Sequence, residues 1–117
     1  MSQKSKEVSE AIALLRKVLG SPAATQQIER SGLATHNFTI EKITSLSINT
    51  SIIVKDYQLA KRYKVVFFFG FTRKGRSKSI MIDVGDSYEK AMMINDAWQA
   101  YSDYRIKEEK INNDIGI

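Results

Sequence analysis

The segment Val-Val-Phe-Phe-Phe-Gly-Phe at residues 65–71 constrains the fold most, because an extended chain would be apolar on both faces there. Such β-branched and aromatic residues favour strands, and a strand without a polar face belongs inside a sheet. A second run of β-formers covers 79–85, after a short basic segment that contains a glycine. These features predict a β-hairpin over 61–85. Gly70 within the first strand predicts a bulge or a close backbone approach.

Two helices are predicted before this hairpin. Apolar residues recur at helical spacing between residues 5 and 19, and Gly20 follows as an end signal. Ser21-Pro22 is a favourable helix start, which predicts a second helix over 22–31 that ends before Gly32. A third helix is predicted over 87–110, opened by a capping box of Asp86 and Glu89.

The connections are less regular. Residues 46–54 alternate between apolar side chains and a row of Ser and Asn, which predicts a half-solvated strand. Residues 55–60 are predicted to connect that strand to the central one. Residues 33–45 fit either an irregular strand or a further helix capped by Thr35, and the pattern does not decide between them.

Together these elements predict an α+β fold. Two N-terminal helices precede a three- to four-stranded antiparallel sheet with a central aromatic-rich strand, and a long C-terminal helix packs on the sheet. The length of 117 residues predicts a single domain over 1–117. Its ends, 1–6 and 112–117, are expected to fray.

The distribution of charge is uneven. The formal net charge is +5, and residues 61–78 alone carry +7 with no carboxylate, so the other 99 residues sum to −2. Cations spaced along a hairpin can contact phosphates, and Tyr63 could stack on a base. We therefore expect a nucleic-acid-binding protein, for either DNA or RNA. The predicted contacts are Lys61, Arg62, Lys64, Arg73, Lys74, Arg76 and Lys78. The alternative is that these cations only protect an apolar strand from aggregation.

A second function is a protein–protein interaction module, such as an assembly factor, a chaperone or an inhibitor. The basic hairpin edge would then meet an acidic protein surface. The C-terminal helix would add an apolar face, which could also join two copies into a homodimer. The predicted interface residues are Met92, Trp98, Tyr101 and Tyr104.

Residues 25–33 resemble the first helix and turn of the helix-turn-helix motifs of bacterial repressors, with Gly32 in the turn. The resemblance weakens after the turn, because 36–45 carries one lysine, one glutamate and two isoleucines. With the 62–84 hairpin as a wing, the resemblance implies a winged-helix arrangement. Against it, wing strands are usually half exposed, whereas 65–71 requires burial.

Enzymatic chemistry has little support. The chain has no cysteine and a single histidine, His36, which is expected in a surface turn. The carboxylates Asp83, Asp86 and Glu89 are explained by a strand face and a helix cap, and no phosphate-binding glycine motif occurs. We expect no enzyme activity, no metal and no cofactor. The N-terminus lacks an apolar leader, so a cytoplasmic protein without membrane contact is expected.

Overall fold

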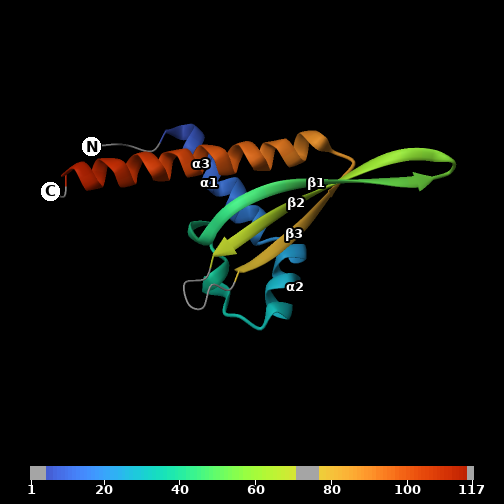
Figure 1. Ribbon diagram of the computed structural model, residues 1–117, viewed down its shortest axis with the longest axis horizontal. Helices are drawn as coiled ribbons and strands as arrows, with labels where there is room; N and C mark the ends of the chain where they lie inside the picture. The colour runs from blue at the N-terminus through green and yellow to red at the C-terminus, as the bar shows by residue number, and fades with distance from the viewer. Residues whose placement is uncertain (1–4, 71–76, 116–117) are drawn as a thin grey trace.

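The structure is a computed structural model that describes residues 5–70 and 77–115, with side chains as far as Glu109. The predicted α+β architecture is confirmed: two helices, a three-stranded antiparallel sheet and a long last helix (Figure 1). The elements are α1 (Lys6–Leu19), α2 (Pro22–Ser31), the 3₁₀ helices η1 (Thr35–Phe38) and η2 (Ile40–Lys42), β1 (Ile43–Lys55), β2 (Gln58–Gly70), β3 (Ser77–Gly85) and α3 (Tyr88–Ile115). Of the ends predicted to fray, 1–4 and 116–117 lie outside the described residues.

Serine hydroxyls start all three α-helices. Ser5 Oγ accepts a hydrogen bond from Val8 N–H at 3.1 Å, and Ser21 Oγ accepts one from Ala24 N–H at 3.4 Å. At α3 the predicted cap is wrong by one residue, because Ser87 Oγ, not Asp86, accepts from a backbone N–H of the first turn at 3.1 Å. The predicted bounds of α1 and α2 are confirmed.

The undecided segment 33–45 is neither one strand nor one α-helix. It forms η1 and η2, separated by Thr39 in an extended conformation, and then enters β1. This break lets Phe38 and Ile40 both point into the core, where they are 4% and 3% exposed. The winged-helix interpretation is therefore wrong, since the segment between α2 and β1 contains two short 3₁₀ helices and no recognition α-helix.

The sheet has the order β1-β2-β3, so β2 is the central strand. A register shift between Ile43 and Ser45 marks a bulge in β1 at Thr44. A Cβ built on Gly70 would lie 2.8 Å from Thr44 Cγ2. The atom that approaches Gly70 thus belongs to a side chain and not to another backbone, and the bulge lies in β1 instead of at Gly70.

The two faces of the sheet differ. The face that we call the core face contributes buried residues to the single hydrophobic core with the helices, among them Val65, Phe67 and Ile80. Residues alternate between faces along a strand, so the intervening residues form the opposite face. We call this second side the open face, and the described core cluster contains none of its residues. Its members are Ser45, Ser47, Asn49, Ser51, Ile53 and Lys55 in β1, Gln58, Ala60, Arg62, Lys64, Val66 and Phe68 in β2, and Ser77, Ser79, Met81 and Asp83 in β3.

Beyond the pair Tyr63–Gly85, β3 ends while β1 and β2 continue as a two-stranded projection, which we call the arm (residues 51–62). Figure 1 shows it extending away from the helices. The strands are joined by a two-residue turn, in which Asp56 and Tyr57 have φ values of 52° and 65°. Positive φ at both positions is the signature of a type I′ hairpin turn. The prediction that 55–60 is a connection is therefore wrong, because all but two of these residues are in strands.

The outer edge of β3 is covered by a side chain. Gln27 of α2 donates through Nε2 to the Met81 carbonyl at 2.5 Å and accepts through Oε1 from Met81 N–H at 2.9 Å. The amide thus replaces a neighbouring strand at one residue, which reduces the risk of edge-to-edge pairing.

Helix α3 packs on α1 and across the sheet through Ala91, Ile94, Ala97 and Tyr101, which are all buried. It continues past the predicted end at 110. In the part of the chain that the structure describes, no helix is both long and apolar enough to span a bilayer.

Candidate nucleic-acid interface

The open face combines polar side chains, cations and one accessible ring. In β1 it presents a row of Ser45, Ser47, Asn49 and Ser51, which follows from their alternation with apolar residues. Beside this row, β2 presents the cations Arg62 and Lys64, and Lys55 adds a third in the arm. Hydroxyl, amide and cationic groups in such a row can all contact phosphate oxygens.

The one carboxylate among the strand residues of this face is Asp83. Its Oδ2 accepts from Arg62 Nη2 at 3.0 Å, and its Oδ1 accepts from Gly85 N–H at 2.7 Å. The hydrogen bond from Gly85 N–H is the main cause that lowers the pKa of Asp83, and desolvation opposes it. The hydrogen bond and charge of Arg62 and the charge of Lys64 lower this pKa further, so the net shift is downward. Arg62 is therefore held in place and partly neutralised, whereas no ion pair engages Lys64 among the described residues.

The seven cations predicted as one site do not share one face. Arg62 and Lys64 are on the open face, but Lys61 pairs with Ile52 on the other side of the arm. Lys78 pairs with Phe69, at the opposite end of the sheet from the arm. Arg73, Lys74 and Arg76 lie outside the described residues. The division follows from the two-residue period of a strand, which sends neighbouring side chains to opposite faces.

The aromatic residues divide in the same way. Tyr63 is on the core-face side, where its ring lies 5.3 Å from that of Tyr88, so it is not on the same face as Arg62 and Lys64. Phe67 and Phe69 are completely buried. Phe68 is 37% exposed on the open face, in register with Ser45 and Ser79. It is the aromatic side chain of that face that can meet a ligand.

The predicted interface on the last helix is largely used within the chain. Tyr101 is buried in the core, with the Arg105 guanidinium 5.7 Å from its ring centroid. Trp98 packs against the same core and is half-buried. Met92 and Tyr104 are also half-buried, which leaves less free apolar surface on α3 than the sequence suggested.

A second charged group lies between α1, η2 and α3. Arg105 Nη1 donates to the Glu41 carbonyl at 2.9 Å, and Arg16 Nη2 lies 3.8 Å from Glu41 Oε1. Burial opposes ionisation of Glu41, but hydrogen bonds from its own backbone and from Thr39, together with the two arginines, lower its pKa. These contacts tie three elements together, which is a structural role. Among the described residues no group of three or more His, Asp and Glu could hold a metal ion.

Two features of the interface escaped the sequence analysis. The sequence pattern places Lys55 in a connection, because the Asp56-Tyr57 turn lacks the glycine that usually marks a hairpin turn. The serine pattern in 45–51 indicates only a solvated face, whereas the strand register places these serines beside Arg62, Lys64 and Phe68. No protein family, curated protein or solved structure matches this chain.

Proposed function

We propose that this protein is a non-enzymatic nucleic-acid-binding protein that holds a single strand across the open face of its sheet. The observation that carries the proposal is the composition of that face. The open face carries three cations, a partly exposed phenylalanine and a row of hydroxyl and amide groups. Its one carboxylate, Asp83, already forms an ion pair with Arg62.

The phosphates would be held by Lys55, Arg62 and Lys64. From Arg62 to Phe68 the strand rises by roughly 20 Å, because each residue advances about 3.3 Å. A surface of that length accommodates a short run of nucleotides. The hydroxyls of β1 lie beside it along the neighbouring strand, about 5 Å away. Backbone contacts of this kind give affinity for phosphate without reading sequence.

A single strand is favoured over a duplex because of Phe68. An aromatic side chain on an exposed sheet can stack only on a base that is already unpaired. Met81, which is 39% exposed, extends an apolar surface next to Phe68, on which a base or a sugar could rest. Cations alone would not distinguish the two forms of nucleic acid.

The direct test is fluorescence anisotropy with labelled 12-nucleotide single-stranded DNA and RNA, and with the matching duplex, over a salt series. In Lys55→Ser/Lys64→Ser, affinity for the single strand should fall, and its log–log salt slope should become shallower by about 1.4, from about 0.7 per phosphate contact. In Phe68→Leu, affinity should fall about fivefold or more, with the salt slope unchanged.

The matched control is Lys42→Ser/Lys107→Ser, which removes the same charge from exposed positions outside the open face. It should bind like the wild type apart from a small general electrostatic effect. If the control loses as much affinity as Lys55→Ser/Lys64→Ser, binding is not located on the open face. If the wild type binds no nucleic acid at about 150 mM salt, the proposed function is wrong.

A role in protein–protein interaction is the second candidate. It is favoured by a specific observation: the other side of the arm exposes the aliphatic residues Ile52, Val54 and Leu59 beside Lys61. This surface does not overlap the open face, so the two roles are compatible.

A further inference from the structure

We propose that two copies of this chain form a dimer by exchanging their arms. The apolar side of each arm would cover the same side of the other arm, and the tip of each would enter a groove in the partner. This inference concerns the opposite side of the arm from the nucleic-acid proposal and does not depend on it.

The first observation is the exposed apolar side of the arm. Ile52, Val54 and Leu59 all lie on its core-face side, yet they are 62%, 73% and 77% exposed because the helices do not extend over the arm. Tyr57 at the tip is fully exposed. A two-stranded hairpin without a third strand or a helix against it is marginally stable at best in water. A second surface packed against the apolar side of the arm would therefore stabilise it.

The second observation is the total surface of the molecule. The chain exposes 8489 Å², whereas a compact monomer of 13.3 kDa exposes roughly 6,500 Å². Its radius of gyration is 16.5 Å, against about 13 Å for a compact domain of this length. The arm is one source of this excess and the projecting end of α3 is another (Figure 1). A standard interface buries roughly 800 Å² on each partner. There is thus enough uncovered surface for a stable dimer.

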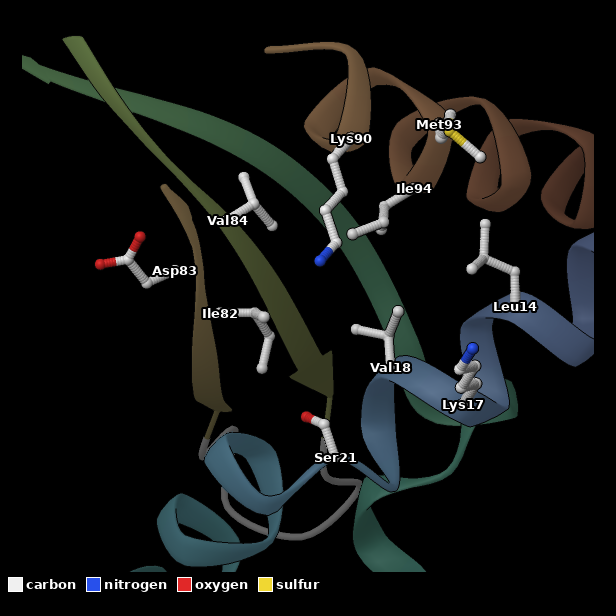
Figure 2. Close-up of a pocket in the computed structure, with 10 residues that line it drawn as sticks. All are labelled: Leu14, Lys17, Val18, Ser21, Ile82, Asp83, Val84, Lys90, Met93 and Ile94. Carbon is white, nitrogen blue, oxygen red and sulfur yellow. The ribbon is translucent and has the colours of Figure 1, made fainter. Parts of the chain in front are cut away.

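The third observation is an apolar groove beside the base of the arm, between α1, β3 and the start of α3. Its volume is about 280 Å³. Figure 2 shows Val18, Ile82, Val84 and Ile94 around the space, with the amino group of Lys90 directed into it and Asp83 directed away. The groove is also lined by Leu14, Lys17, Ser21 and Met93.

Charge makes a second copy a suitable occupant. The arm tip carries Asp56 next to its apolar residues, and the groove carries Lys17 and Lys90. None of these three groups has an ion pair within the described residues. An aliphatic segment that ends in one carboxylate matches an aliphatic groove with two ammonium groups at its margin.

The geometry allows the exchange to be reciprocal. The tip lies about 20 Å from Tyr63, six strand residues away. The groove begins at Val84, beside the Tyr63–Gly85 pair at the base of the same arm. Two arms that pack face to face through their apolar sides and run in opposite directions are related by a twofold axis. In this arrangement the tip of each arm lies at the base of the partner's arm. Such an interface is closed, so assembly stops at two copies.

The backbone at the tip supports a role in binding. Tyr57 has a φ of 65°, a conformation that favours glycine and is costly for an aromatic residue. Strain of this kind at an exposed position points to a functional reason for the side chain. In the exchanged dimer, Tyr57 would lie against the partner.

The first test is sedimentation equilibrium between 1 and 100 μM. The wild type should sediment with twice the 13.3 kDa mass of the chain. Ile52→Thr/Val54→Thr/Leu59→Thr retains β-forming residues but removes the apolar side, and it should weaken association at least 100-fold. The control Ser51→Thr/Gln58→Thr alters the other side of the same arm and should remain dimeric. A monomeric wild type, or a triple variant that dimerises like the wild type, would overturn the proposal.

The second test locates the contact, and it uses the absence of cysteine from the chain. In Leu59→Cys/Met93→Cys, the two sites of one chain cannot be bridged, because α3 runs back from the base of the arm while the arm runs forward (Figure 1). Mild oxidation should give a covalent dimer and nothing larger. Leu59→Cys/Gln26→Cys, with its second site on α2 outside the groove, should give no such product. A ladder of larger species, a monomer only, or an arm that captures a different protein would each overturn the reciprocal exchange.

Discussion

The contact between Gln27 and Met81 gives the sharpest prediction about stability. Replacing Gln27 by alanine removes both hydrogen bonds from the outer edge of β3. Each such bond contributes about 0.5–1.5 kcal/mol net. Both are solvent-exposed, so water can partly replace them, and we expect Gln27→Ala to cost about 1–1.5 kcal/mol in total.

The matched control is Gln26→Ala, one residue earlier on the same helix. Gln26 is exposed, and alanine improves helix propensity equally at both positions, by a few tenths of a kcal/mol. The difference between the two variants therefore isolates the edge contact. With an unfolding entropy of roughly 250 cal/mol/K for 117 residues, that difference corresponds to about 4–6 °C in Tm.

The assay is urea unfolding followed by circular dichroism, at one protein concentration for all three proteins. If the free energies of unfolding of Gln27→Ala and Gln26→Ala differ by less than about 0.3 kcal/mol, the Gln27 amide does not stabilise the sheet edge and the reasoning is refuted. A Gln27→Ala protein that also aggregates faster would be consistent with an uncovered strand edge.

Three further predictions follow from local geometry. Gly70→Ala should cost about 1 kcal/mol, because its Cβ would collide with Thr44 Cγ2. Thr44→Ser removes this methyl group but keeps the hydroxyl that donates to the Phe68 carbonyl, so in that background Gly70→Ala should cost nothing. A double-mutant cycle measured by urea unfolding that shows no coupling between the two positions would contradict this. Because the pKa of Asp83 is lowered on folding, its contribution to stability is full above its ordinary value of 3.8 and is lost as the pH falls through the lowered pKa. The stability gap between wild type and Asp83→Asn should therefore be constant from pH 7 to 5 and close in stronger acid, and a constant gap down to pH 2.5 would be the contrary result. In the monomeric Ile52→Thr/Val54→Thr/Leu59→Thr background, Tyr57→Gly should raise stability by about 0.5 kcal/mol by relieving the positive φ, whereas Tyr57→Ala should not. Equal effects of the two in urea unfolding would show that φ is not the cause.

The predictable parts of the fold rest on residues with a local mechanism. Ser21-Pro22 and Gly32 define α2 because a cap, a fixed φ and a left-handed residue act within one turn. The hairpin over 61–85 was predictable from two β-forming runs and the basic segment between them. Segment 33–45 was not, because Phe38 and Ile40 reach the core through two 3₁₀ turns whose direction depends on tertiary packing.

The candidate site was only half predictable. The concentration of charge in 61–78 points to β2. A count of cations cannot show that the two-residue period of the strand places Lys61 and Arg62 on opposite faces. The arm was missed because its turn is Asp-Tyr, with neither residue a glycine. The role of Gln27 could not be predicted, since its contact with Met81 spans 54 positions of sequence.

The central claim is that nucleic acid binds the open face, and amide chemical-shift mapping by NMR tests it most directly. Isotope-labelled protein would be titrated with an unlabelled 12-nucleotide single strand at 150 mM salt. The account predicts shifts concentrated at Ser47, Asn49, Lys64 and Phe68, with α1 and α3 unaffected. Shifts centred on Lys17 and Lys90, or no shifts at millimolar nucleotide, would contradict it.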